Sequence, residues 1–293
     1  MLMEGTPCKK SASTDTHFKE PSMAFIFRQD KVANEMYEAA ARARKPGERK
    51  YLGMSEIGKP CDRALWYSFR GFDKAPVDGR MIMLFRFGDR IEGEVVHWLT
   101  EAGYEIRDRQ RSFLVHGGMF AGHWDGEIHG VTQRPHVLEV KSANTKRFKA
   151  FKDFGVQKTS PTYYCQAQCY MGYSGLERAL FVIQCKDTSE LYTERVYFMK
   201  SDFEALHERA RYIITANAIP EKPFKQDNFE CTWCDYRLQC WCPDEAIVTL
   251  HVCGTCRYLG FQDLHRFCKN VAHPFEIQQW GIGCDDWEER RDA

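Results

Sequence analysis

The sequence predicts an α/β fold in which helices flank a mixed central sheet, with a small cysteine-rich region at the end of the chain. Stretches with the 3.6-residue period of a helix alternate with stretches rich in β-branched and aromatic residues, in the order helix, strands, helix, strands, helix. After Pro223 this periodicity is lost and cysteines become frequent. We therefore expect a disordered tail over residues 1–24, a main domain over residues 25–243 and a cysteine-rich metal-binding module over residues 244–293.

The composition is that of a soluble globular protein. Hydrophobic residues make up 43% and charged residues 28% of the 293 positions, and no run of about 18 apolar residues suggests a membrane span. The polar start, MLMEGTPCKKSASTDTHFKEPS, lacks the apolar stretch of a signal peptide and indicates either a disordered tail or an upstream start before Met23. Thirteen cysteines without a secretory signal favour a reducing compartment, so we expect a cytoplasmic protein of a bacterium or a phage-infected cell.

Net charge gives no guidance about nucleic acid, because 41 basic residues balance 41 acidic ones. A local basic patch is present at residues 141–158, KSANTKRFKAFKDFGVQK, with six basic residues and one aspartate. The patch is either a solvated face or part of a nucleic-acid surface.

The individual elements follow from periodicity and from stop signals. The first helix is predicted at residues 28–44, a second after the loop SEIGKPC, and a third at residues 83–103, where Gly103 supplies the stop. Gly-rich turns separate strands over residues 112–142, and residues 162–175 form a helix that ends at glycine. A β-pair follows at residues 178–187 and 191–199. A last helix, residues 201–219, begins with a capping box of Ser201 and Glu204.

The segment HVLEVKS, residues 136–142, places a glutamate and a lysine two positions apart on a predicted strand. Residues i and i+2 share a face, so Glu139 and Lys141 point the same way. On its own, the pattern is what an amphipathic strand with charges outside also shows. Asp125 in GHWDGEI changes this interpretation, because an adjacent strand can place it beside Glu139. Two close carboxylates are best explained by a shared hard cation such as Mg²⁺.

Asp125, Glu139 and Lys141 together resemble the Asp…Glu-x-Lys motif of the PD-(D/E)XK nuclease superfamily, in its RecB-like and lambda-exonuclease-like branches. The proline of the motif name is absent, since Trp124 precedes Asp125. The resemblance implies a restriction-endonuclease-like sheet and a Mg²⁺ or Mn²⁺ ion on the two carboxylates. It also implies that Lys141 orients the attacking water or stabilises developing negative charge.

Two further segments extend the resemblance. In FRFGDRIEGEVVHWL, Glu92 is the candidate third metal ligand, with His97 as a rival that is otherwise an interior or interface histidine. In PTYYCQAQCYMGYSG, Gln166 and Tyr170 have the Gln-x-x-x-Tyr spacing of RecB-like nucleases and share a helical face. The resemblance implies that they line the DNA groove. Gln168 is an alternative to Gln166.

A cysteine pattern, C-x2-C-x5-C, is present in FECTWCDYRLQC. Three thiolates so close together suggest a metal ion or cluster that needs a fourth ligand, for which Cys61 is the candidate. One cysteine before the core and three after it resemble the iron–sulphur RecB-like nucleases, which include the CRISPR-associated adaptation exonucleases. The resemblance implies a 4Fe–4S cluster; zinc is the alternative, and Cys242 could replace the last cysteine. The four candidate ligands are Cys61, Cys231, Cys234 and Cys240.

A second cysteine pattern, C-x2-C-x11-C-x15-C, lies in the last 50 residues. It suits a tetrahedral Zn²⁺ site, and a metal would stabilise a segment too short to bury a core alone. The alternative is scattered buried cysteines. The candidate ligands are Cys253, Cys256, Cys268 and Cys284, with His265 and His273 as substitutes. The remaining cysteines, Cys8, Cys165, Cys169 and Cys185, are expected to be a tail thiol and small buried hydrophobes.

The resemblance implies a metal-dependent DNA exonuclease that acts in recombination, repair or replication. DNA is the expected partner, together with a single-strand annealing protein or a helicase. The alternatives are a structure-specific endonuclease, a nuclease acting on RNA, a non-catalytic nucleic-acid-binding protein with structural metal sites, or a redox or metal sensor.

Overall fold

The computed structural model describes residues 30–43, 51–246, 248, 251–270 and 284–291. The tail expected over residues 1–24 and the substitute ligand His273 lie outside these residues. None of the helices in the described part of the chain is both long and apolar enough to cross a membrane.

The central element is a five-stranded mixed sheet with the order β2-β5-β6-β7-β8. Only β6 and β7 run parallel; the other neighbours are antiparallel. A smaller sheet has the order β1-β4-β3. The strands of the central sheet are β2 (Glu105–Arg107), β5 (Gly126–His129), β6 (His136–Ala143), β7 (Arg178–Cys185) and β8 (Leu191–Tyr197), and those of the smaller sheet are β1 (Leu52–Gly53), β3 (Ser112–Val115) and β4 (Phe120–His123).

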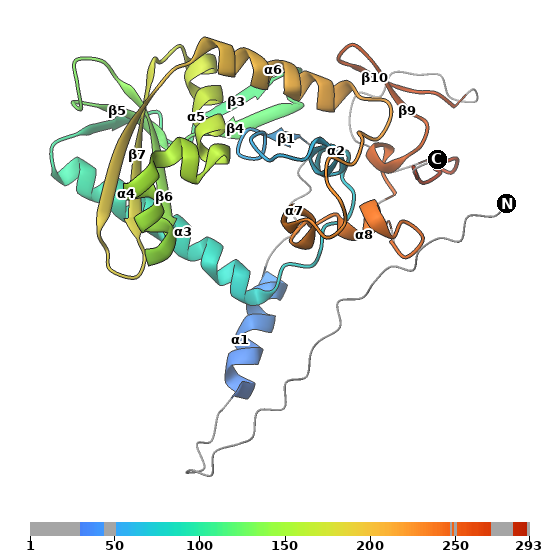
Figure 1. Cartoon of the computed structure of the whole chain (residues 1–293), viewed down its shortest axis with the longest axis horizontal. Coiled ribbons are helices and arrows are strands. Elements are labelled where there is room, and N and C mark those ends of the chain that lie inside the picture. The colour runs from blue at the N-terminus through green and yellow to red at the C-terminus, as the bar shows by residue number, and fades with distance from the viewer. Residues whose placement is uncertain (1–29, 44–50, 247, 249–250, 271–283, 292–293) are drawn as a thin grey trace, which may run out of the picture.

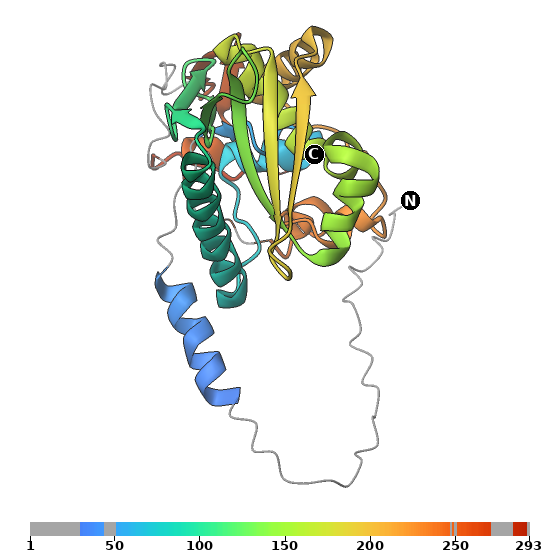
Figure 2. The ribbon, with the colours of Figure 1, turned by 90° about the vertical axis from the view of Figure 1, so that its left-hand side faces the viewer.

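Helices cover both faces of the central sheet, which confirms the predicted mixed α/β class. Helix α3 (Gly79–Glu101) packs on β6 and β2, whereas α4 (Thr145–Thr159) and α5 (Pro161–Ser174) pack on β6 and β7 from the other side. Figure 2 shows the strands between α3 and α4. Side-chain alternation on β6 follows from this arrangement: Leu138 and Val140 pack with Ile91 of α3, and Val137 faces the opposite core.

The remaining large helices complete the main domain (Figure 1). Helix α1 (Asp30–Ala43) contacts α3, and α6 (Lys200–Thr215) packs against α5 and against α2 (Asp62–Arg70). Helix α2 buries several large side chains, among them Trp66, Tyr67 and Arg70. The predicted helices thus exist, with ends shifted by a few residues.

Two local predictions are wrong. Helix α6 begins at Lys200 after Met199, and the side chain of Ser201 does not cap it. The backbone N–H of Met199 instead donates to Gln168 Oε1 at 2.8 Å, so a neighbouring helix fixes this end. The strand expected through Asp125 is also interrupted, because Trp124 and Asp125 form a bend between β4 and β5, which belong to different sheets.

Helix α4 was not expected from the sequence. Its charged residues read as a surface patch, but Phe148 and Phe151 are buried against the sheet side of the helix. The helix is kinked at Gly155, where φ is +75°, and Glu194 of β8 accepts a hydrogen bond of 2.7 Å from the next backbone N–H, that of Val156.

The cysteine-rich end consists of short elements that lie on the main domain. Leu259 and Phe261 belong to the same hydrophobic cluster as Phe69 of α2. The buried guanidinium of Arg290 donates to the carbonyls of Asn217 and Leu259, among others. The described part of residues 244–293 therefore shares the core of the main domain, and a separate module stays a prediction. The elements after α6 are α7 (Phe229–Thr232), α8 (Arg237–Trp241), η1 (Cys253–Thr255), β9 (Leu259–Gln262) and β10 (His265–Cys268).

Candidate active site and cysteine pocket

Asp125 and Glu139 lie side by side where the two sheets diverge. The β5–β6 register pairs Gly126 with Leu138, so the preceding Asp125 falls beside Glu139. The backbone N–H of Val140 donates to Asp125 Oδ2 at 2.7 Å. This hydrogen bond fixes the aspartate at the strand that carries the Glu-x-Lys pattern.

Glu139 and Lys141 form a close and mostly buried pair. Lys141 Nζ lies 2.6 Å from Glu139 Oε2, and the carboxylate is fully buried. An amphipathic strand with charges outside is therefore the wrong interpretation of HVLEVKS, because α5 and α4 cover this face of β6. Within the described residues neither carboxylate oxygen of Glu139 has a hydrogen bond of regular geometry. A buried carboxylate in this condition is available to another ligand.

The local charges shift both groups. Burial, with added repulsion from Asp125 and Glu92, raises the pKa of Glu139 to about 8 although Lys141 opposes the shift. Burial alone would lower the pKa of Lys141, but the carboxylates of Glu139 and Asp125 outweigh it and raise that pKa above its usual range. Lys141 is thus a permanent cation at neutral pH.

Glu92 of α3 approaches Asp125 and Glu139 from the other side of the sheet. We call these three carboxylates the acidic group. Burial and the nearby Asp125 raise the pKa of Glu92. Its Oε1 accepts hydrogen bonds from Gln110 Nε2 at 2.9 Å and from Arg109 Nη2 at 3.3 Å. Both donors lie in a loop where Asp108 and Gln110 have positive φ, a strained conformation for residues with a side chain. Sequence reasoning missed Arg109 and Gln110, and only the local run of polar residues marks them.

His97 is not an interior residue; the alternative, an interface histidine, stays a prediction. Its side chain is exposed on α3, and its ring centroid lies 4.8 Å from that of Trp98. His97 is five residues after Glu92, so the two side chains do not share a face of α3 and His97 points away from the acidic group.

Gln166 and Tyr170 are adjacent on α5 and both are buried. Gln166 Nε2 donates to the Tyr170 hydroxyl at 3.2 Å, and that hydroxyl donates to the carbonyl of His123 at 2.7 Å. Burial, followed by the charge of Glu139, raises the pKa of Tyr170. A Cβ on Gly122 would lie 2.8 Å from the tyrosine hydroxyl, so glycine is needed there. The pair braces the strand that leads to the Asp125 bend.

The alternative residue Gln168 has a different environment. It is fully buried, its Nε2 donates to the carbonyl of Tyr197 at 2.9 Å, and its Oε1 accepts from Met199. These contacts hold the end of β8 and the start of α6. Gln166 is therefore the glutamine that faces the candidate active site.

Two residues that the sequence did not single out stand next to Lys141. The ring of Tyr163 on α5 lies 5.2 Å from Lys141 Nζ, measured to the ring centroid. The guanidinium carbon of Arg147 on α4 lies 5.4 Å from the same centroid. Arg147 belongs to the basic patch at residues 141–158, whereas no pattern marks Tyr163. The aromatic ring therefore brings two cations to one edge of the site.

The acidic group suits a hard cation by donor chemistry. All its candidate ligands are carboxylates, and one of them has buried oxygens without regular hydrogen bonds. Among the described residues no three His, Cys, Asp or Glu side chains already converge as a metal shell. Each carboxylate instead has a neighbour of its own: Lys141 Nζ forms an ion pair with Glu139, the backbone N–H of Val140 donates to Asp125, and Gln110 donates to Glu92. Mg²⁺ is commonly held by one or two carboxylates plus water and substrate phosphates, so two suffice.

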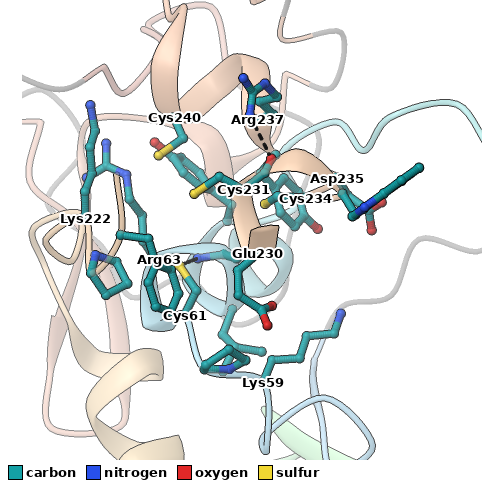
Figure 3. A pocket seen from close by; sticks show the side chains of 18 of the residues that line it. Lys59, Cys61, Arg63, Lys222, Glu230, Cys231, Cys234, Asp235, Arg237 and Cys240 are labelled. Atoms are coloured by element: carbon teal, nitrogen blue, oxygen red, sulfur yellow. Dashed lines mark hydrogen bonds between the residues drawn. The ribbon is translucent and has the colours of Figure 1, made fainter. Parts of the chain in front are cut away.

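The four cysteines of the first pattern line one cavity of about 200 Å³ between α2 and α7–α8. Figure 3 shows their side chains around this pocket, with Cys61 at the start of α2. Cys242, by contrast, is buried and does not line it, which favours the last cysteine of the C-x2-C-x5-C pattern as the ligand. The cavity residues from the pattern are Cys61, Cys231, Cys234 and Cys240.

These thiols form a soft donor set of the kind that a cluster or a zinc ion takes, and among the described residues they do not form a closed shell. Burial raises the pKa of Cys61, Cys234 and Cys240, and neighbouring thiols add to the rise. Four half-buried thiols that repel one another as thiolates gain most from a shared positive centre. The Tyr67 hydroxyl of α2 donates a hydrogen bond of 3.3 Å to the carbonyl of Gln239 in α8, which joins the two segments directly.

The second cysteine set is less compact. Cys256 is buried, Cys253 and Cys268 are half-buried, and Cys284 is exposed. Cys268 pairs with Leu259 across the β9–β10 hairpin, which places it near the Cys253–Cys256 turn. In the described part of the chain these residues do not meet as a metal shell.

The fold and the site define a class: a mixed α/β protein with carboxylates and a lysine at a strand junction. No family model matches the chain, and no curated protein does. Solved structures that resemble it include SSO0001, with 13% identity, a TM-score of 0.44, and coverage of 71% of this chain and 95% of that one. An alkaline exonuclease from Laribacter hongkongensis has 15% identity, a TM-score of 0.40, and coverage of 61% and 89%. Its complex with dAMP has 14% identity, a TM-score of 0.41 and the same coverage.

Proposed function

We propose that this protein is a Mg²⁺- or Mn²⁺-dependent DNA exonuclease that hydrolyses phosphodiester bonds in recombination, repair or replication. The observation that carries the proposal is the buried carboxylate of Glu139, which has Asp125 beside it and Lys141 Nζ 2.6 Å away. A protein without a use for this group would gain little from burying it.

Asp125 and Glu139 would hold the metal, with Glu92 as the third carboxylate. When bound, the ion supplies Lewis-acid polarisation of the phosphodiester and lowers the pKa of a water molecule. A cation held by these carboxylates would compete with Lys141 for Glu139 and with Arg109 for Glu92.

Lys141 has the role of a donor. Because the carboxylates keep it protonated, it does not accept a proton from water. It donates hydrogen bonds, either to the attacking water, which it orients, or to the oxygens on which negative charge develops. Gln166 and Tyr170 act one layer behind, since their hydrogen bonds end on the carbonyl of His123 two residues before Asp125.

The metal sites of the cysteines complete the proposal. The pocket of Cys61, Cys231, Cys234 and Cys240 would hold a 4Fe–4S cluster, with zinc as the alternative. Its role is structural, because it joins α2 to a segment about 170 positions later in the sequence. The second set would hold zinc at the Cys253–Cys256 turn.

Digestion of end-labelled linear DNA and closed circular DNA with Mg²⁺ or Mn²⁺ tests the proposal. We expect linear DNA to lose mononucleotides while circles stay intact, and EDTA to stop the reaction. Cutting of circles would instead indicate an endonuclease. A protein that binds DNA but leaves both substrates intact would be a binding module, and the nuclease proposal would be rejected.

A further inference from the structure

The basic patch contains one residue whose position differs from the others. Arg147 packs its guanidinium over the rings of Phe151 and Tyr163, at 5.8 and 5.4 Å from the ring centroids, and its Nη2 donates to Ser160 Oγ at 3.1 Å. These contacts hold a solvent-exposed side chain in one place. Within the described residues only this one side-chain N–H donates, so most donors of the guanidinium remain for a ligand.

A ligand of Arg147 is expected to be an anion, and it would also contact the candidate active site. Lys141 Nζ lies 5.2 Å and the Arg147 guanidinium carbon 5.4 Å from the Tyr163 centroid, so these two atoms are at most about 11 Å apart. Both cationic groups lie next to this ring, and within the described residues no carboxylate forms an ion pair with Arg147. A nucleic-acid strand carries a phosphate for about every 3.4 Å of helix axis. Because two phosphates are at least as far apart as their separation along the axis, a phosphate bound by Arg147 lies no more than about three nucleotides from one at Lys141.

Resting on the function proposed above, we propose that Arg147 is a positioning residue that binds a backbone phosphate flanking the cleaved one, with Tyr163 as its platform. Arginine suits this role because its planar fork binds phosphate oxygens in pairs and stacks on aromatic rings. Lysine at this position keeps the charge but loses both properties.

The chain offers a matched control on the same helix. Lys149 is exposed and lies two positions after Arg147, about 200° around a helix of 3.6 residues per turn, so it faces away from Tyr163. Its substitution by alanine removes the same charge from the same helix. A difference between the two variants therefore reports position and not net charge.

Kinetics with an end-labelled DNA duplex and Mg²⁺ at several NaCl concentrations give the first test. For Arg147→Ala we expect KM to rise about 10-fold, kcat to stay within about twofold, and the salt slope of log KM to fall by about 1. Arg147→Lys should keep the slope and recover part of the KM. Lys149→Ala should match the wild type. Equal effects of Arg147→Ala and Lys149→Ala, or an unchanged slope, would overturn the assignment.

A binding measurement separates this inference from the nuclease proposal. Fluorescence anisotropy with a labelled duplex in EDTA compares Lys141→Ala protein with the Lys141→Ala, Arg147→Ala double variant. We expect about 10-fold weaker binding and a smaller salt slope for the double variant, even if the wild type cuts no DNA. Equal affinity of the two variants for the duplex would reject the phosphate contact. If the double variant lost thermal stability together with DNA binding, Arg147 would be a purely structural residue.

Discussion

The backbone N–H of Val140 donates a hydrogen bond of 2.7 Å to the carboxylate of Asp125, and this contact joins the bend after β4 to the central strand β6. Because successive side chains of a strand alternate, Val140 packs toward α3 while Glu139 and Lys141 point to the opposite face. The bend thus brings an aspartate to the one strand that carries both other groups. The geometry of the site depends on this junction between two sheets.

Lys141→Ala tests the catalytic arrangement. Loss of a positioned cation that stabilises developing charge costs on the order of 10²- to 10³-fold in rate, so we expect at least this loss in kcat on linear DNA with Mg²⁺. The measurement is single-turnover digestion, with circular dichroism to check the fold. Lys149→Ala is the control and should retain full activity. Activity of Lys141→Ala within a few-fold of the wild type would remove Lys141 from the mechanism.

The raised pKa of Glu139 predicts how the stability of the metal-free protein depends on pH. The unfolded chain loses this proton near pH 4.5, whereas the folded protein keeps it to about pH 8. Between these values the folded state binds more protons than the unfolded state, so the free energy of unfolding falls as pH rises. Urea unfolding in EDTA across this window should show that fall.

Glu139→Gln provides the comparison for the pH prediction. The variant cannot lose a proton, so its unfolding free energy should decline less over the same window. His116 and His136, whose pKa values burial lowers, contribute a rise in stability with pH, but they are present in both proteins. The difference between the two curves therefore isolates Glu139, and parallel curves would contradict the raised pKa.

How much the sequence could predict differs between parts of the site. The two-residue period of a strand places Glu139 and Lys141 on one face, and the spacing to Asp125 fits a hairpin. Both could be predicted because each depends only on residues close together in the sequence. Burial of Glu139 could not be predicted, since it depends on α4 and α5 folding over β6. Helix α4 itself was missed because its exposed lysines hide the buried Phe148 and Phe151.

The loop that holds Glu92 was beyond sequence reasoning for a different reason. Residues with positive φ outside glycine are rare, so Asp108 and Gln110 read as ordinary polar positions. The cysteines show the opposite case. Their spacing predicted a group of three thiols with Cys61 as the candidate fourth, and the structure places Cys61 at the same pocket as these three cysteines far along the chain.

Arg109→Ala tests whether the loop competes with the metal. Arg109 Nη2 lies 3.3 Å from Glu92 Oε1, and its removal leaves that carboxylate more available to a cation. We expect the Mg²⁺ concentration for half-maximal activity to fall a few-fold. Arg107→Ala is the control, because Arg107 is exposed and pairs with Glu105 on β2. An increased Mg²⁺ requirement would mean that Arg109 positions Glu92 instead of competing for it.

Cys61→Ser tests the metal in the cysteine pocket without disturbing the helix. Cys61 is the N-cap of α2, where its Sγ accepts from the backbone N–H of Ala64 at 3.4 Å, and serine is an equally good N-cap. Anaerobically purified wild type should be brown and contain iron, and the variant should lose both colour and iron. The control Cys185→Ser affects a buried cysteine outside the pocket. Colourless wild type with bound zinc would reject the cluster.

Arg290→Ala tests whether the cysteine-rich end stabilises the main domain. The buried guanidinium donates to the carbonyls of Arg257 and Leu259 in this end and to that of Asn217 after α6, so its loss leaves buried acceptors without donors. Such losses cost about 1–3 kcal/mol each in isolation and are not additive, which gives an expected total of about 3 kcal/mol. Urea unfolding measures this difference, with Arg291→Ala, an exposed neighbour, as the control. If the cysteine-rich end folded independently of the core, unfolding of the main domain would be unchanged and a separate low-stability transition would appear.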